Sequence, residues 1–272
     1  MIEALLFMAK KWTKNLLLIE KNRVNTILFL KLIFLAVKRK DKPGNFFDGR
    51  WHIEYPDAHS AFYSYYEIFL REIYKLDADK NQRLNILDVG ANIGMSIMYY
   101  RENYPNALIY AYEPDPFIFE ILQNNLGRNN VSNATALNCA AWHEATTLSF
   151  SQDKSDGGRI CDEINSDKLI VISAINICEV LESNHYDFIK IDIEGAENEL
   201  FSHIAKSLVR CDRIFLEYHS IRNKKQILGD IIKHFSENNY RVTLTSISKN
   251  WSPFVKTKAT YFDGQYNIWA KR

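Results

Sequence analysis

Short apolar runs alternate with amphipathic segments over the second half of the chain. Runs rich in β-branched and aromatic residues predict strands at residues 85–89, 108–112, 135–138, 188–191 and 213–217. Helix-like segments separate several of these runs. Strands that alternate with helices are typical of βαβ units, so the pattern predicts a parallel sheet.

Three of the intervening segments carry helix signals. The first runs from Gly94 to about residue 103 and is closed by Tyr104 and Pro105, since proline cannot continue a helix. The second follows the prolines of the Glu-Pro-Asp-Pro run at 113–116 and is expected to end with Gly127 as its C-terminal cap. The third covers residues 197–208, with an apolar stripe along one side.

The last part of the chain has a different pattern. Residues 240–247 and 266–270 predict two strands joined by a long loop, and we expect them to form an antiparallel pair at one edge of the sheet. The expected fold class is therefore α/β: a mostly parallel seven-stranded sheet with an antiparallel C-terminal hairpin and helices on both faces. The expected domain organisation is a basic extension (1–40), a helical lead-in that covers the substrate cleft (41–84) and a catalytic domain (85–272).

Aromatic residues in the lead-in recur at roughly helical spacing. They are Tyr63, Tyr65, Tyr66, Phe69 and Tyr74. Two interpretations stay open: these side chains wall a substrate cleft, or they form a helix face that packs on the sheet.

The first 40 residues differ from the rest in charge. They carry nine basic and two acidic residues, and an apolar stretch runs from Val24 to Val37 with Lys31 at its middle. This stretch is too short to span a bilayer, which takes about 20 apolar residues. No small-residue cleavage site follows it, so a secretory signal is a poor match. Two interpretations stay open: a peripheral helix on an anionic membrane, or a helix that packs on the domain or on a second subunit in a homodimer.

The composition is that of a globular protein, with 47% hydrophobic and 25% charged residues. Lys+Arg 34 against Asp+Glu 33 gives a net charge of +1. Binding to nucleic acid needs a concentrated basic surface, so no nucleic-acid partner is expected. The cysteines at 139, 161, 178 and 211 form no C-x-x-C pair, which argues against a zinc site or a disulfide framework. They suit a reducing cytosol, and we expect a cytoplasmic protein.

The strand at 85–89 leads into a glycine turn and then a helix. This arrangement directs the strand end and the helix N-terminus toward a ligand. A dinucleotide site is the main rival interpretation, but its fingerprint needs G-x-G-x-x-G, and here Asn92 stands in place of the middle glycine. Asp88 beside the turn would repel a pyrophosphate and attract the ammonium group of a methionine.

Glu113 lies at the end of the next strand, where it can accept hydrogen bonds from both ribose hydroxyls of an adenosine. A phosphate-free adenosine with an amino-acid tail is S-adenosylmethionine. The residues therefore favour this cofactor over a nicotinamide dinucleotide.

Three segments together resemble the FkbM family of methyltransferases. They are Leu-Asp-Val-Gly-Ala-Asn-Ile-Gly at 87–94, Tyr-Glu-Pro at 112–114 and Ile-Lys-Ile-Asp-Ile-Glu-Gly-Ala-Glu at 189–197. The resemblance covers roughly residues 85–269. It implies a class I methyltransferase with a Rossmann-like fold, in a family several of whose members methylate hydroxyls of sugars or polyketides. It also implies the cofactor-binding residues, which are Asp88, Gly90, Ala91, Asn92, Gly94, Glu113, Pro114, Asn138, Cys139, Ala140 and Asp192.

Candidate catalytic residues follow the strands at 188–191 and 213–217. Lys190 in a buried strand needs a partner, and we expect Asp192 and Glu217 to provide it. A hydroxyl nucleophile gains from a base, and His219 is the preferred one because a free imidazole titrates near neutrality. Asp192 and Glu194 would orient the hydroxyl or the cofactor. In the alternative interpretation Asp192, Glu194, Glu217 and His219 bind a divalent metal such as magnesium, although no metal is part of the leading prediction.

The leading functional prediction is an O-methyltransferase that acts on a glycan or small metabolite. A protein or nucleic-acid methyltransferase is the second possibility, and an inactive S-adenosylmethionine-binding scaffold is the third. The absence of an Asn-Pro-Pro-Tyr-like tetrapeptide after the fourth strand argues against methylation of base amines.

Overall fold

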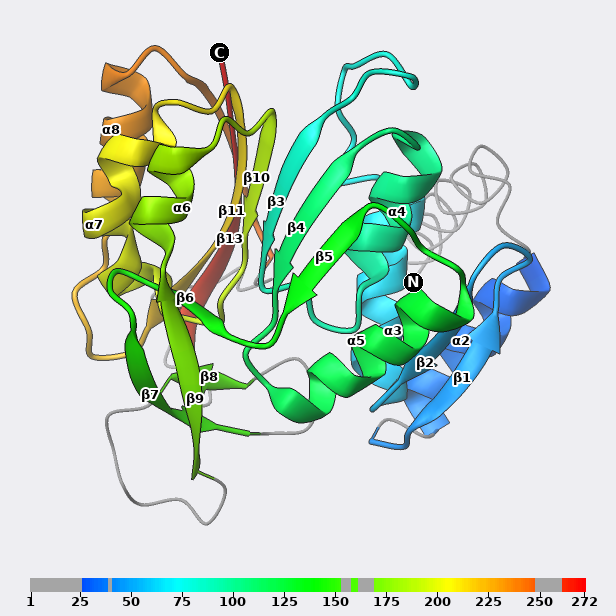
Figure 1. Ribbon diagram of the computed structural model, residues 1–272. Helices are drawn as coiled ribbons and strands as arrows, with labels where there is room; N and C mark the ends of the chain where they lie inside the picture. Colours follow the sequence, from blue (N-terminus) through cyan, green and yellow to red (C-terminus); the bar gives the residue numbers. More distant parts are fainter. Residues whose placement is uncertain (1–25, 39–40, 153–157, 161–168, 248–260) are drawn as a thin grey trace, which may run out of the picture.

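The computed structural model describes residues 26–38, 41–152, 158–160, 169–247 and 261–272. Its main element is a seven-stranded sheet with the order β12-β13-β11-β10-β3-β4-β5 (Figure 1). The strands are β3 (Asn85–Val89), β4 (Leu108–Tyr112), β5 (Ala134–Leu137), β10 (Phe188–Ile191), β11 (Arg213–Ile221), β12 (Arg241–Ser246) and β13 (Phe262–Lys271). Only β13 runs antiparallel to its neighbours in this sheet. The predicted class I methyltransferase fold, with its parallel core and antiparallel C-terminal pair, is confirmed.

Helices cover both faces of this sheet (Figure 1). The helices α4 (Met95–Asn103) and α5 (Pro116–Arg128) pack on one face; α6 (Ile177–Ser183), α7 (Glu197–Leu208) and α8 (Leu228–Glu237) pack on the other. Alternation along the strands divides the core in the same way. Ile86 and Phe188 join the first core, whereas Leu87 and Ile189 join the second.

The order of the strands places the ends of β3 and β10 side by side. The two strands are parallel, with Lys190 opposite Asp88 and Ile191 opposite Val89. The chain leaves β3 toward β4 and reaches β10 on the other side, so the strand order reverses here. Ligands of open α/β sheets bind at such a reversal, outside the carboxyl ends of the strands.

Several predicted element boundaries differ from those in the structure; β13, for example, begins at Phe262 and not at residue 266. Gly127 does not cap α5, because the helix continues to Arg128 and Asn129 is its C-terminal cap. The residue in the left-handed region is Asn130, with φ +51°, and asparagine tolerates this conformation better than most residues. The strand predicted at 213–217 extends to Ile221, which brings His219 inside β11.

A second, four-stranded sheet of order β6-β9-β7-β8 was not predicted. Its strands are β6 (Ala140–Trp142), β7 (Thr146–Ser151), β8 (Arg159–Ile160) and β9 (Leu169–Asn176). The alternation of Leu148 and Phe150 with polar residues was the available signal. This sheet lies below the ends of the central strands in Figure 1 and supplies part of the candidate site.

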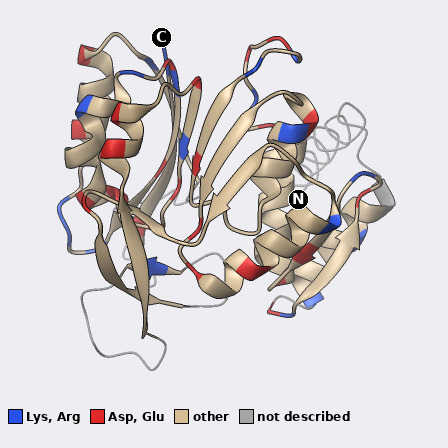
Figure 2. Cartoon of the chain, in the orientation of Figure 1, with Lys and Arg blue, Asp and Glu red and all other residues tan. Residues whose placement is uncertain are grey.

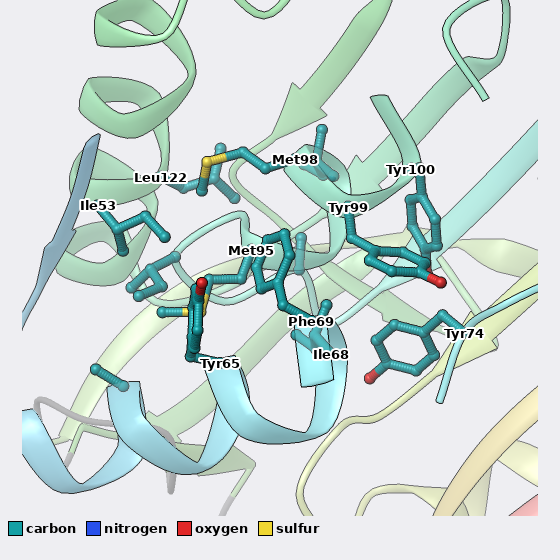
Figure 3. Packing of buried hydrophobic residues seen from close by; sticks show 14 of the residues in the cluster. Ile53, Tyr65, Ile68, Phe69, Tyr74, Met95, Met98, Tyr99, Tyr100 and Leu122 are labelled. Carbon is teal, nitrogen blue, oxygen red and sulfur yellow. The ribbon is translucent and has the colours of Figure 1, made fainter. Parts of the chain in front are cut away.

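The lead-in contains a hairpin and a bent helix. Its elements are β1 (Gly44–Phe47), β2 (His52–Tyr55), α3 (Ala58–Tyr65) and the π-helical turn η1 (Tyr66–Leu70). Helix α2 (Thr26–Lys38) precedes the lead-in and lies in the predicted basic extension. Tyr65 and Phe69 are buried beside Met95 (Figure 3), which fits the packing interpretation of these aromatics. The hairpin of β1 and β2 was not predicted.

Helix α2 belongs to the same core. Leu28, Phe29 and Leu32 are buried, and Phe29 contacts Phe62 of α3 at 5.8 Å between ring centroids. The rest of the predicted basic extension, residues 1–25 and 39–40, lies outside the described residues. Among the described helices, none combines the length and the apolar character needed to cross a bilayer.

Charged residues of both signs are interspersed over the described elements, and the central strands carry few of them (Figure 2). The buried charges are therefore exceptions. They include Asp88, Glu113, Lys190, Glu197 and His219, which lie at or near the carboxyl ends of β3, β4, β10 and β11.

Candidate functional site

The turn after β3 is built around Gly90. Its φ is +83°, and a Cβ at this position would lie 1.8 Å from the carbonyl oxygen of Asp192. Only glycine fits so close an approach in this conformation. The amides of Gly90 and Ala91 donate to the carbonyl oxygen of Tyr112 at 2.9 and 3.0 Å, which ties the turn to the end of β4.

Glu113 is held at the end of β4 by backbone donors. Its carboxylate accepts from the amide of Asn92 and from the amide of Asp115, each at 2.9 Å. Burial raises the pKa of Glu113 to about 7, although the two amides and Lys190 act in the opposite direction. The carboxylate is therefore fixed in place and borders the space in front of the turn.

The first cavity, of about 690 Å³, opens in front of this turn. Seven of the predicted cofactor residues line it: Gly90, Asn92, Glu113, Pro114, Cys139, Ala140 and Asp192. Ile118 and Phe150 add apolar walls of the kind that suit a purine ring.

Four other predicted cofactor residues do not line this cavity. Ala91 faces a second cavity, and Gly94 begins α4 with φ +86°. Asn138 donates to the carbonyl oxygens of Glu113 and Pro114 at 2.9 and 3.1 Å, so it braces the strand end from behind. The fourth, Asp88, is buried below the turn.

Several lining residues were missed by the sequence analysis. Phe150 and Ile160 come from the small sheet, which was not predicted. Asp115 and Ile118 come from the start of α5. Proximity to the Glu-Pro-Asp-Pro run was the signal for the last two, because that run follows directly on the predicted ribose-binding carboxylate.

Asp88 has no exposed surface. It accepts a hydrogen bond from Ser96 Oγ and lies 3.3 Å from Lys190 Nζ. Asp88 therefore has no exposed surface for direct contact with an ammonium group, and its part in cofactor binding stays a prediction. The carboxylate instead balances the charge of Lys190 below the turn.

Lys190 pairs with Asp192, as predicted, and with Asp88, which was not predicted. It donates to the carbonyl oxygen of Gly90 and contacts Asp88 and Asp192, the latter at 3.7 Å. Burial alone would lower its pKa, but Asp88 and Asp192 outweigh that effect and raise it. Glu217, the predicted second partner, raises the pKa of Lys190 less than Asp88 and Asp192 do. Lys190 is therefore a permanent cation under the glycine turn.

A second cavity of about 710 Å³ also borders the turn, where Gly90, Ala91 and Asn92 line it. Tyr63, Ser64 and Glu67 of α3 and η1 form one wall. Lys190 and Glu217 line the opposite part. The predicted cleft cover thus contributes residues to a cavity wall, while its buried aromatics pack in the core.

The two cavities share the residues Gly90, Asn92, Asp192 and Glu194. Asp192 follows β10 directly, and Glu194 lies two residues further on with φ +53°. Both side chains remain partly exposed. A molecule in either cavity can therefore reach the same pair of carboxylates.

His219 lies within β11 and has no exposed surface. Its Nδ1 is 3.3 Å from Glu197 Oε1, and its Nε2 is 3.4 Å from Glu194 Oε2 and 3.5 Å from Glu217 Oε1. Burial alone would lower the pKa of His219, but these carboxylates outweigh it and hold the pKa well above its ordinary value. The imidazole is therefore enclosed by three carboxylates and has no exposed surface, and its role as general base stays a prediction.

Glu197 holds the loop between β10 and α7 in place. Its carboxylate accepts from the amides of Ile193 and Gly195 at 3.1 and 3.0 Å, and it faces His219 Nδ1. Glu197 was not among the predicted site residues, although it closes the motif at 189–197.

The carboxyl group of Glu217 has a shifted pKa. Burial raises this pKa to about 7, with a further contribution from Asp192.

Comparisons with known proteins agree with this geometry. The family model described as the methyltransferase FkbM domain matches residues 88–242, more than half of the chain. Methyltransferase 1 of Beauveria bassiana is 25% identical over 158 residues, which are 49% of this chain and 63% of that protein. Methyltransferase sdnD of Sordaria araneosa is 38% identical over 89 residues, which are 32% of this chain and 34% of that protein.

The matched segments thus span less than two thirds of these two relatives. Among solved structures, the methyltransferase FkbM of Methylobacillus flagellatus is 17% identical, with a TM-score of 0.49. That match covers 77% of this chain and 50% of the solved one.

Proposed function

The chain belongs to the FkbM family of methyltransferases, and on that premise we propose that it methylates a hydroxyl oxygen of a sugar, a glycan or a small metabolite. The observation that carries the proposal is the shared wall of the two cavities at Asp192 and Glu194. Methyl transfer is an in-line displacement, so donor and acceptor must approach one point from opposite sides.

S-adenosylmethionine, the cofactor, supplies a methyl group on a positively charged sulfur. The residues of the first cavity fit this molecule. Glu113 offers a fixed carboxylate for the ribose hydroxyls, and Ile118 and Phe150 flank a place for the adenine. Asp192 and Glu194 at the far end place negative charge where the cationic sulfur must lie.

The second cavity supports a polyhydroxylated acceptor. Tyr63 and Ser64 offer hydroxyls, and Glu67 and Glu217 offer carboxylates that accept hydrogen bonds from hydroxyls. The same carboxylates would repel a phosphate backbone, which disfavours a nucleic-acid acceptor. Asp192 and Glu194 border both cavities, so their carboxylates are in position to orient the hydroxyl and accept its proton.

The test is transfer of a labelled methyl group from S-adenosylmethionine to a panel of hydroxylated acceptors that includes free sugars and lipid-linked glycans. The proposal predicts a methoxy product, identified by carbon NMR. Asp192→Asn should lower the turnover rate by about 10²-fold or more, since it removes a group that positions the reacting hydroxyl. Asp230→Asn, at an exposed position of α8, is the matched control and should keep full activity.

A product labelled on nitrogen or carbon would contradict the proposal. Equal turnover by the Asp192→Asn variant and the control would contradict the role given to Asp192. Thermal melting of both variants shows whether a loss of activity comes from unfolding.

A further inference from the structure

Both ring nitrogens of His219 lie close to carboxylates. Nδ1 faces the buried carboxylate of Glu197 at 3.3 Å. Nε2 is also buried, and among the described residues no group hydrogen-bonds to it. The carboxylate of Glu197 orients the ring, so that a metal ion can take the place of the proton on Nε2; a carboxylate on the far ring nitrogen is the arrangement found behind metal-bound histidines.

Nε2 points at a cluster of carboxylates. Glu194 Oε2 lies at 3.4 Å and Glu217 Oε1 at 3.5 Å from this nitrogen. Asp192 comes from the adjacent strand end, and its Oδ1 is buried without a hydrogen bond from any described group. The other oxygen of Asp192 faces Lys190, so this carboxylate has one oxygen available on the side of the cluster.

Three of these residues have spacings that suit one ion. Ligand atoms of Asp192, Glu194 and His219 all lie within 4.8 Å of one another. Hard divalent cations bind oxygen ligands at about 2.0–2.6 Å, so ligands on opposite sides of an ion are about 4–5 Å apart. A single ion can therefore reach all three groups without a change in the backbone.

Among the described residues, the charges around this point are unequal. Four carboxylates come from Asp192, Glu194, Glu197 and Glu217, whereas Lys190 and His219 contribute two cationic groups, and Lys190 is also paired with Asp88. Carboxylates in a partly buried cluster repel one another, and a divalent cation in the place of the Nε2 proton reduces that repulsion.

We propose that Asp192, Glu194 and His219 bind a divalent cation of the magnesium–manganese class at the junction of the two cavities. Carboxylate oxygens with one imidazole suit these ions, and the partly exposed Asp192 and Glu194 leave room for water or a substrate hydroxyl as further ligands. Binding of the ion rests on these residues alone. Its part in catalysis, which is to bind the acceptor hydroxyl and ease loss of its proton, rests on the proposed function.

The test uses the full chain, freed of metal by dialysis against a chelator, and titrated with Mn²⁺ without cofactor or acceptor. Electron paramagnetic resonance measures the free Mn²⁺ at each step. We expect one bound Mn²⁺ per chain, displaced by excess Mg²⁺. His219→Gln and Asp192→Asn should each weaken binding by at least about tenfold, the lower end of what outer-shell substitutions cost at metal sites.

Asp230→Asn removes an exposed carboxylate from α8 and is the matched control, expected to bind as the wild type does. A thermal melt shows that each variant is folded. Failure of the wild type to bind Mn²⁺ at millimolar concentration would overturn the proposal. Equal binding by the wild type and both ligand variants would overturn it as well. Either result leaves methyl transfer itself to be judged by the acceptor screen, so failure of the two proposals is distinguishable.

Discussion

The α-carbon of Gly90 lies against the carbonyl oxygen of Asp192, so close that a Cβ on residue 90 would be 1.8 Å from that oxygen. This contact joins the ends of β3 and β10 and fixes the distance between the glycine turn and the carboxylates that follow β10. The shape of both cavities at Gly90 and Asp192 therefore depends on the absence of a side chain at residue 90.

Gly90→Ala should abolish binding of S-adenosylhomocysteine and lower the melting temperature. Gly49→Ala is the matched control, because Gly49 also has a positive φ of +97° but has no atom within 4 Å of the added Cβ. The control should be destabilised only by the backbone strain of an alanine at positive φ, which lowers the free energy of unfolding by about 1–3 kcal/mol. Calorimetric titration and thermal melting measure the two effects. Equal losses in the two variants would mean that the contact with Asp192 has no role of its own.

Replacement of Glu113 should weaken the cofactor site. Glu113→Ala loses the acceptor for the ribose hydroxyls, and we expect S-adenosylhomocysteine to bind about 2–4 kcal/mol more weakly. NAD should not bind to the wild type, and calorimetry measures both ligands. Tight binding of NAD would contradict the assignment of the first cavity.

The raised pKa of Glu113, about 7, predicts that ligand binding depends on pH. The ionised carboxylate is the better acceptor for ribose hydroxyls, so affinity for S-adenosylhomocysteine should fall as the pH drops below 7. Between pH 8 and pH 6 the expected decrease is about tenfold, since the ionised fraction falls by that factor. Burial and Asp115 raise this pKa while Lys190 lowers it, and these groups are unchanged in Glu113→Gln. That variant should show a flatter profile, and an equally steep one would assign the titration to another group.

The raised pKa of Glu113 also makes the free energy of unfolding depend on pH. The pKa of Glu113 is higher in the folded chain than in the unfolded chain, so the folded state binds the proton more tightly between the ordinary pKa of a glutamate and about 7. As the pH rises through this window, Glu113 makes folding less favourable. In urea titrations of the ligand-free chain, Glu113→Gln should therefore gain stability relative to the wild type from pH 5 to pH 8. A constant difference over this range would contradict the assignment.

Glu197→Ala should destabilise the fold strongly. The substitution leaves His219 facing an empty position and frees the amides of Ile193 and Gly195. Loss of one partner of a buried charged pair costs about 3–5 kcal/mol of the free energy of unfolding. Glu199→Ala, at an exposed position of the same helix, should cost less than about 0.5 kcal/mol. Urea denaturation compares the two, and similar midpoints would show that the buried pair contributes little.

The outer face of α2 suits a membrane surface. Its inner side packs in the core, whereas Leu30, Phe34 and Val37 are 46%, 58% and 72% exposed. Lys31 and Lys38 lie on the same helix, and basic residues are abundant in the first 40 positions. We expect the chain to sediment with anionic vesicles at low salt and to be released at high salt, because each basic residue near the surface contributes about 1 kcal/mol that salt screens.

Phe34→Ser combined with Val37→Ser should reduce this sedimentation, and Val171→Ser, at an equally exposed apolar position of β9, should not. Substitutions are needed here because deletion of residues 1–40 would remove Leu28, Phe29 and Leu32 from the core. Recovery of the wild type in the supernatant at low salt would eliminate the membrane interpretation and favour packing against a protein partner.

Much of the fold and part of the site follow from the sequence. The apolar runs of β3, β4, β10 and β11 are mostly buried and therefore leave a clear pattern. Parallel strands bring their ends to one edge, and this is why Glu113 and Asp192 could be expected near the glycine turn. The small sheet is partly exposed, and its apolar and polar residues alternate less clearly along the sequence. Phe150 and Ile160 were therefore not predicted as site residues.

The role of His219 could not be inferred in the same way. The predicted strand ended at residue 217, which left the histidine at an exposed strand end, whereas β11 continues to Ile221 and buries it. Two of its three carboxylate partners, Glu194 and Glu197, come from the loop after β10 and from the start of α7, more than 20 residues away in the chain. The pKa of a histidine depends on such neighbours, and residue spacing in a sequence does not reveal them.

A crystal structure of the chain with S-adenosylhomocysteine would test the central claim most directly. We expect the ribose hydroxyls to lie within hydrogen-bond distance of Glu113 and the adenine to lie between Ile118 and Phe150. The sulfur should point toward Asp192 and Glu194, where the two cavities meet. The second cavity beyond that junction should remain open for the acceptor. Density for the ligand in the second cavity, or a sulfur directed away from Asp192 and Glu194, would contradict it.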